Sequence, residues 1–215
     1  MNDIKLQIST GNSRHSIKWK PTHITWGELV RKLSEPIRTS ETLEHFLSLK
    51  RSEQDAIKDV GGFVGGTLNG ERRQNKTVVS RSTLTLDLDN IPDGETETVI
   101  EAVKKLGYAA AIYSTKKHRP EAPRLRIVMP LSAPVPKDEY EPIARKVAEY
   151  IGMSYCDPTT FEPARLMYWP TCCSDSDFVF RAFDAKLLDG ANVLKAYGSN
   201  DEWKDASKWL NDRYT

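Results

Sequence analysis

The sequence predicts an α+β fold, and two observations lead to this prediction. From residue 83 onward the hydrophobic pattern gives the order strand, helix, strand, strand, helix, strand, strand, which is not a regular parallel βαβ repeat. The chain has 215 residues, of which 39% are hydrophobic and 28% charged, a composition typical of a globular protein. Its length suits one full core with a small appendage.

The first 60 residues predict a hairpin followed by helices. The stretches KLQIS and SIKWK alternate in polarity on either side of GNSRH, as paired strands do. Thr25 and Glu28 have the spacing of a capping box, which predicts a helix that begins at Thr25 and ends at Leu33. A second helix is expected after Thr39 or Ser40, because either residue is a suitable cap.

The segment TLTLDLD predicts a strand with two different faces. Apolar and polar residues alternate, so leucines line one face while Thr85, Asp87 and Asp89 line the other. A helix is expected from Thr96 to Leu106, and Gly107 stands where a C-cap glycine belongs.

Further strands and one more helix complete the predicted core. YAAAIYST and RLRIVMPLS are expected to neighbour each other in one sheet, with KKHRPEAP as the loop between them. A helix from Lys137 to Ile151 comes next. The segment YCDPTTFEPARLMYWP then runs through a turn into a strand, and FVFRAF forms the last strand.

The tail beyond Phe183 is expected to be a linker before a short helix at Trp203 to Leu210. No internal repeat or low-complexity tract interrupts the chain. The predicted division is therefore a small N-terminal αβ part at residues 1–60, a core at 61–185, and a linker with a short helix at 186–215.

Charge and hydropathy exclude several classes of protein. The 31 basic and 30 acidic residues nearly cancel, so net charge does not mark a nucleic-acid binder. No apolar run approaches the roughly 20 residues of a membrane span, and the N-terminus lacks a signal-peptide core. We therefore expect a cytoplasmic protein, in a bacterial or host cytosol, without membrane association. Cys156, Cys172 and Cys173 are expected to be reduced thiols and are poorly spaced for zinc.

Asp87 and Asp89 are the main candidates for chemistry. Two carboxylates on one face of an otherwise apolar strand repel each other, and a bound cation would relieve the repulsion. Mg²⁺ and Mn²⁺ prefer carboxylate oxygens, and shared acidic ligands are typical of two-metal sites. A strand whose polar face is simply solvated is the alternative explanation.

Cationic and hydroxyl side chains follow further along the chain. The end of YAAAIYST and the loop that follows it are dense in phosphate-directed donors: Ser114, Thr115, Lys116, Lys117 and His118. Arg124 and Arg126 share one strand face, and arginine holds phosphate oxygens in a two-pronged manner. Asp157 adds a third carboxylate, and Arg165 adds another cation. A solvated basic turn, and for Asp157 an ordinary turn before proline, are the alternatives.

Taken in order, these motifs resemble those of the archaeo-eukaryotic primase superfamily, especially primase-polymerases of phages, prophages and mobile plasmids. The resemblance covers about Gly61 to Phe183. LTLDLDN is similar to the family's hydrophobic-DxD-hydrophobic strand, and YSTKKH to its serine or threonine shortly before a histidine. CDPTTFEPARLMYWP is similar to its acidic residue before an arginine-bearing strand. Two lysines separate Thr115 from His118, a longer spacing than in the compact motif.

The resemblance implies an RRM-like antiparallel sheet backed by helices, joined to the small N-terminal αβ part. It implies two divalent ions, Mg²⁺ or Mn²⁺, held by Asp87, Asp89 and Asp157, and catalysis by these residues with His118 at the phosphates of the incoming nucleotide. The expected nucleotide-binding residues are Ser114, Thr115, Lys116, His118, Arg124, Arg126 and Arg165. The candidate surface for nucleic-acid phosphates, which a solvated loop explains equally well, is Arg72, Arg73, Lys76 and Arg81.

The implied activity is template-dependent nucleotidyl transfer by a DNA primase or DNA polymerase of a phage, prophage or plasmid replication system. The expected partners are a single-stranded DNA template, a primer-template and deoxynucleotides or ribonucleotides. No G-x-x-x-x-G-K-[ST] motif occurs, so the helicase often attached to such primases is not expected in this chain. If the native system has one, it is expected as a C-terminal extension or a separate protein. The alternative is a catalytically inactive primase-like module that binds single-stranded nucleic acid or a replication partner.

Overall fold

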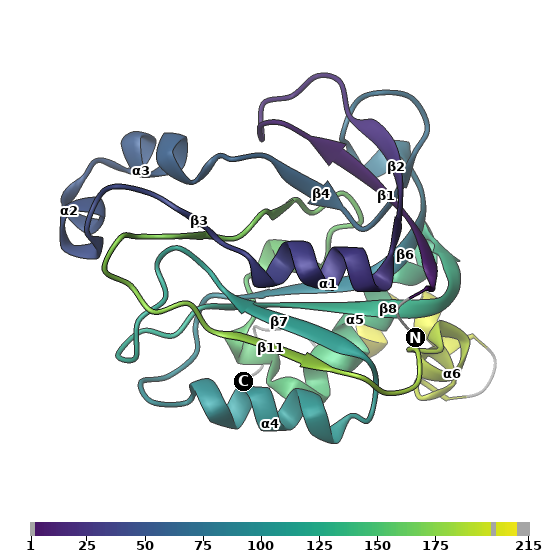
Figure 1. Ribbon diagram of the computed structural model, residues 1–215. Helices are drawn as coiled ribbons and strands as arrows, with labels where there is room; N and C mark the ends of the chain where they lie inside the picture. Colours follow the sequence, from purple (N-terminus) through teal and green to yellow (C-terminus); the bar gives the residue numbers. More distant parts are fainter. Residues whose placement is uncertain (1–2, 199–200, 210–215) are drawn as a thin grey trace.

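The computed structural model describes residues 3–198 and 201–209, and its centre is a five-stranded sheet (Figure 1). The strand order is β11-β7-β8-β6-β5, and all neighbours in it are antiparallel. The strands are β5 (Gly66–Leu68), β6 (Val78–Leu88), β7 (Ala110–Ser114), β8 (Leu125–Pro136) and β11 (Phe180–Phe183). The predicted α+β class, with an antiparallel sheet backed by helices, is confirmed.

Strand β6 has the two faces that its alternating sequence predicts. Leu84, Leu86 and Leu88 are fully buried in one hydrophobic core together with residues of α4 (Thr96–Lys105) and α5 (Lys137–Ile151). Both helices match the predicted ranges closely. Burial of these leucines fixes the register of β6, so the polar residues between them face the opposite side of the sheet.

Helix α1 (Trp26–Ser34) covers that opposite side, packing a second core against Ala111, Tyr113 and Val128 of the central sheet. Figure 1 shows α1 and α4 on opposite sides of β7. The predicted capping box at the start of α1 is present: the Glu28 N–H donates to the Thr25 hydroxyl at 3.2 Å, and the Thr25 N–H donates to the Glu28 carboxylate at 2.8 Å.

A second sheet, in the order β2-β1-β4-β9, lies beside α1 and joins the N-terminal strands to β9. Its strands are β1 (Lys5–Gly11), β2 (Lys20–Thr25), β4 (Gly62–Val64) and β9 (Met167–Tyr168). Two further strands, β3 (Ile37–Arg38) and β10 (Thr171–Cys172), form a separate parallel pair. This sheet combines strands of the predicted N-terminal part and core. The domain boundaries at residues 60 and 185 stay predictions.

The N-terminal hairpin corrects one sequence expectation. SIKWK does not form the second strand, because β2 begins only at Lys20. Trp19 folds back instead: its indole N–H donates to the Ser16 carbonyl at 2.9 Å, and its ring is 2% exposed. A Cβ on Gly11 would lie 2.9 Å from this ring, so the close packing of Trp19 requires glycine there.

The remaining helices are short. Helix α2 (Leu43–Ser48) is capped by Thr42 rather than by Thr39 or Ser40, and α3 (Arg51–Lys58) was not predicted. Figure 1 shows α2 and α3 at one end of the molecule and α6 (Gly190–Lys195) at the other.

Among the described residues there are also five 3-10 helices: Asn75–Thr77, Met153–Tyr155, Pro158–Phe161, Glu202–Lys204 and Ala206–Lys208. The last two replace the predicted terminal helix, whose final residue lies outside the described residues. In the described part of the chain no helix is long and apolar enough to cross a membrane.

The capping box yields a stability prediction. Thr25→Ala removes the acceptor for the Glu28 N–H and is expected to lower the free energy of unfolding by about 1 kcal/mol. Thr25→Ser keeps the hydroxyl and is expected to unfold close to the parent. Urea denaturation followed by circular dichroism measures both variants, and equal destabilisation of the two would contradict a role for the hydroxyl.

Candidate active site

Strands β6 and β8 place Asp87 directly opposite Arg126 in the antiparallel ladder. The Asp87 side chain is 4% exposed, and its two oxygens accept from Arg126 Nε at 3.2 Å and Nη2 at 3.4 Å. Arg165 Nη2 donates to the same carboxylate at 3.1 Å. Two arginines therefore compensate for the burial of this charge.

Asp157 reaches the same place from a turn. It caps the 3-10 helix at Pro158–Phe161, where its carboxylate accepts from the N–H and the hydroxyl of Thr159, both at 2.8 Å. Its backbone N–H donates to the Asp87 carbonyl at 2.9 Å, which ties the turn to β6. Arg165 Nη2 lies 2.5 Å from Asp157 Oδ2. One nitrogen of Arg165 therefore bridges Asp87 and Asp157.

Asp89 lies just beyond the end of β6 and pairs with Arg124 Nη1 at 2.9 Å. Burial raises the pKa of Asp89, and the nearby charge of Asp87 adds to the rise, while Arg124 opposes it. The pKa of Asp157 is lowered despite its burial, because Thr159 and Arg165 favour the carboxylate. The raised pKa of Asp89 thus agrees with the predicted repulsion between the carboxylates of Asp87 and Asp89.

The three aspartates line one cavity of about 730 Å³. Its other charged or ring-bearing lining residues are Arg14, His15, Arg51, Lys58, Arg73, Arg126, Glu162, Arg165 and Tyr168. A smaller cavity of about 60 Å³ lies next to it, sharing Lys58, Asp89, Arg126 and Tyr168 and adding Thr115, Lys116, Lys117, Arg124 and Thr171. Asp87, Asp89, Asp157 and the three predicted arginines therefore meet at one place.

The turn after β7 is arranged differently from the expectation. Ser114 is buried, and its hydroxyl accepts the Val179 N–H at 3.0 Å, so it packs inside the sheet. Lys116 is also buried: its ammonium pairs with Glu41 at 2.7 Å, contacts the Thr39 hydroxyl and lies 5.0 Å from the ring centre of Phe46. Both side chains hold the turn against neighbouring segments.

His118 lies apart from the aspartates. Its Nδ1 accepts the Arg124 N–H at 3.1 Å, and burial lowers its pKa. The residue lines another cavity, of about 520 Å³, bounded by the start of α4 and the segment from Asp175 to Val179. In this structure His118 shapes the hairpin that carries Arg124.

The four residues of the predicted nucleic-acid surface separate into three environments. Arg72 and Lys76 are exposed. Arg73 is half-buried beside the large cavity and donates to the Ala164 carbonyl at 3.0 Å. Arg81 is fully buried, which corrects the expectation that it faces a nucleic acid.

The buried guanidinium of Arg81 has its own acceptors. Its donors reach the carbonyls of Gly65 and Pro163 at 3.1 and 2.6 Å and the Thr85 hydroxyl at 2.9 Å, and it lies 3.9 Å from the ring centre of Tyr140. Pro163 belongs to the segment that carries Asp157 and Arg165. Arg81 therefore positions this segment against the sheet.

Sequence reasoning missed the contribution of the N-terminal part to the large cavity, namely Arg14, His15, Arg51 and Lys58. Arg51 and Lys58 are seven residues apart, which places them on one side of a helix, but α3 itself was not predicted. Arg14 and His15 stand in a loop with no recognisable motif. Only the tertiary structure brings them to the aspartates.

The donor set suits a divalent cation, because Asp87 and Asp157 already share one cationic nitrogen and Asp89 lies in the wall of the same cavity. Within residues 3–198 and 201–209, however, no three acidic, histidine or cysteine side chains are grouped closely enough to hold a metal ion. The guanidinium of Arg165 lies between two of the candidates.

An antiparallel sheet covered by helices carries the carboxylate cavity at the end of β6. The VapE N-terminal domain family matches residues 1–212, and the chain belongs to this family.

The AEP domain of the cyanophage S-2L primase-polymerase is a solved structure similar to this chain. It has 13% sequence identity and a TM-score of 0.46 over 89% of this chain and 88% of its own. No curated protein matches the chain.

The opposite pKa shifts of Asp89 and Asp157 predict opposite effects of neutralisation. A raised carboxyl pKa costs stability above that pKa, so Asp89→Asn is expected to stabilise the metal-free protein at pH 7.5, with the gain vanishing as the pH falls through that pKa. A lowered pKa contributes stability that is present above the ordinary carboxyl pKa and is lost only below it, so Asp157→Asn is expected to destabilise at pH 7.5 and less at about pH 3. Both changes should be about 1 kcal/mol or less.

Urea titrations in EDTA at the two pH values measure these differences. Destabilisation by Asp89→Asn at pH 7.5 would contradict the sign assigned to Asp89.

Proposed function

We propose that the chain is a template-dependent nucleotidyltransferase, a DNA primase or DNA polymerase of a phage, prophage or plasmid replication system. The observation that carries the proposal is the meeting of Asp87, Asp89 and Asp157 in one cavity with an excess of basic side chains. Carboxylates that hold metal ions, next to cations that hold phosphates, are the two requirements of phosphoryl transfer. Membership of the VapE N-terminal domain family supports the primase-like assignment.

In this proposal Asp87, Asp89 and Asp157 are the ligands of two divalent ions, Mg²⁺ or Mn²⁺. When bound, such ions activate a 3′-hydroxyl and stabilise charge on a triphosphate. The arginines now paired with these carboxylates must then exchange partners. Arg126 and Arg165 would leave Asp87 for phosphate oxygens, for which a guanidinium is well shaped.

Buried donors support phosphate binding at the same place. The Nε–H groups of Arg73 and Arg165 are buried and have no hydrogen-bond acceptor among the described residues, although both residues line the cavity. A phosphate oxygen would satisfy such groups. Thr115 and Arg124, in the wall of the smaller cavity, would add further donors. His118 enters the proposal through Arg124, whose N–H it accepts.

The template and primer strands would be held through their phosphates, with Arg72, Arg73 and Lys76 as candidate contacts. The products would be an extended strand and pyrophosphate.

A second candidate function has its own support. A primase-like module without catalysis, which binds single-stranded nucleic acid or a replication partner, would keep its carboxylates permanently paired with arginines. The pairing of Asp87, Asp89 and Asp157 with Arg126, Arg124 and Arg165 favours this alternative. Primer extension distinguishes the two functions.

Primer extension is expected with Mg²⁺ or Mn²⁺ and deoxynucleotides or ribonucleotides. Asp87→Ala is expected to lower the extension rate more than about 100-fold, because even groups that only support metal ligands contribute 10–100-fold. The matched control is Asp138→Ala, which removes a 79% exposed carboxylate at the start of α5. A reaction without primer shows whether the chain also initiates strands.

Extension by the Asp87→Ala protein at the parental rate would remove Asp87 from the reaction. No extension by the folded parent, together with retained binding to single strands, would favour the inactive module.

A further inference from the structure

A second group of positive charges borders the aspartates and comes from two separate segments. Arg51 and Lys58 belong to α3, whereas Lys117 and Arg124 belong to the hairpin between β7 and β8. Arg51 lines the larger cavity, Lys117 and Arg124 line the smaller one, and Lys58 lines both. The four cations therefore surround the boundary between the two cavities.

Asp55 of helix α3 pairs with two cations, one from the helix itself and one from the loop between β1 and β2. Arg51, Asp55 and Lys58 follow one another at intervals of four and three residues, so they share one face of the helix. Asp55 pairs with Lys58 at 2.7 Å and with Arg14 at 2.8 Å. The Lys58 hydrogen bond, together with the one from Arg14, lowers the pKa of Asp55 to about 2, so the carboxylate stays charged.

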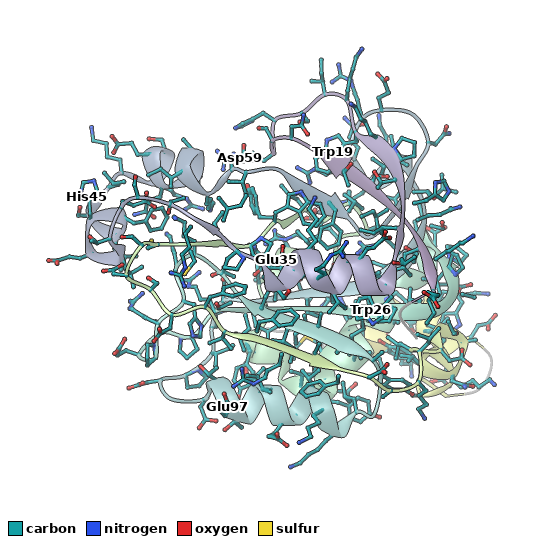
Figure 2. All side chains as sticks on the ribbon, viewed as in Figure 1. Trp19, Trp26, Glu35, His45, Asp59 and Glu97 are labelled. Atoms are coloured by element: carbon teal, nitrogen blue, oxygen red, sulfur yellow. The ribbon has the colours of Figure 1, made fainter. Side chains whose placement is uncertain are left out.

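The loop between β1 and β2 is anchored to the same helix. Asp59, at the end of α3, accepts the Ser13 hydroxyl at 2.6 Å and the Arg14 N–H at 2.8 Å. Figure 2 shows Asp59 beside this loop. Asp55 thus holds the side chains of Lys58 and Arg14, and Asp59 holds the loop that carries Arg14, although neither aspartate lines a cavity.

Positive charge exceeds negative charge around the two cavities. Nine lysine and arginine residues line them, against four aspartate and glutamate residues. In the described part of the chain, Arg51 and Lys117 make no ion pair. Burial lowers the pKa of Lys117, and the charges of Lys58, Arg124 and Arg51 lower it further, so these cations repel one another. An anion bound among them would relieve the repulsion.

We propose that Arg51, Lys58, Lys117 and Arg124 form a binding site for a chain of phosphates, the triphosphate of a nucleotide. This assignment rests on the proposed function for the identity of the substrate, but the site itself rests on the charges alone. The site contains Lys117 and two residues of α3 in place of the expected Lys116 and His118. Lys116 pairs with Glu41, and His118 accepts the Arg124 N–H. A triphosphate fits better than a nucleic-acid backbone because the site adjoins the three aspartates.

Inorganic tripolyphosphate is the direct probe, because it carries the phosphates without a base or a reaction. Isothermal titration of the 215-residue chain is expected to show binding that weakens with salt. Arg51→Gln and Lys117→Gln are each expected to weaken it about five- to tenfold. The matched controls are Arg31→Gln and Lys104→Gln, exposed residues that line neither cavity, and both are expected to bind like the parent.

Three outcomes would overturn the site: no binding of tripolyphosphate to the parent, unchanged affinity in Arg51→Gln and Lys117→Gln, or equal losses in the controls. A parallel titration with a single-stranded oligodeoxynucleotide separates the two phosphate sources. If only oligonucleotide binding depended on Arg51 and Lys117, the triphosphate assignment would be wrong.

The test is independent of catalysis. If tripolyphosphate binding needed Arg51 and Lys117 but extension did not need Asp87, the phosphate site would stand and the proposed nucleotidyltransferase would fail. If extension needed Asp87 while tripolyphosphate affinity was unchanged in both variants, the reverse would hold.

Discussion

The bridge that Arg165 makes between Asp87 and Asp157 is the interaction on which the site depends. A carboxylate as buried as Asp87 is tolerated only when cations compensate for its lost hydration. Arg165 supplies this compensation from a segment that the buried Arg81 fastens at Pro163. Arg165, which lines the cavity, and Arg81, which is buried, therefore couple the central sheet to the turn at Asp157 and to the segment before β9.

This coupling gives the N-terminal part a role in the site. Because β9 pairs with β4, and β4 with β1, the segment that carries Arg165 is continuous with the N-terminal sheet. The loop after β1 and helix α3 then contribute side chains to the wall of the cavity, with Asp55 and Asp59 linking the loop to the helix. The N-terminal part, which the sequence presents as a small appendage to the core, thus supplies basic side chains around the aspartates.

The sequence predicts well those features that local pattern determines. The period of two in β6, the capping box at Thr25 and the two amphipathic helices behind the sheet follow from the spacing of neighbouring residues, and the structure confirms them. Features set by distant partners were not predictable. The burial of Arg81 depends on Gly65 and Pro163, and that of Lys116 on Glu41, so both resembled solvated or phosphate-binding cations. The cations of α3 were missed because nothing local connects them to Asp87.

In the proposed function, the carboxylates that pair with arginines hold metal ions once a nucleotide is bound. Electron paramagnetic resonance of Mn²⁺ measures this binding, with the parent and Asp157→Asn compared with and without a nucleoside triphosphate. We expect little protein-bound Mn²⁺ without nucleotide, a distinct bound signal when nucleotide is added to the parent, and loss of that signal in Asp157→Asn. An identical bound signal in the parent and in Asp157→Asn would contradict the account.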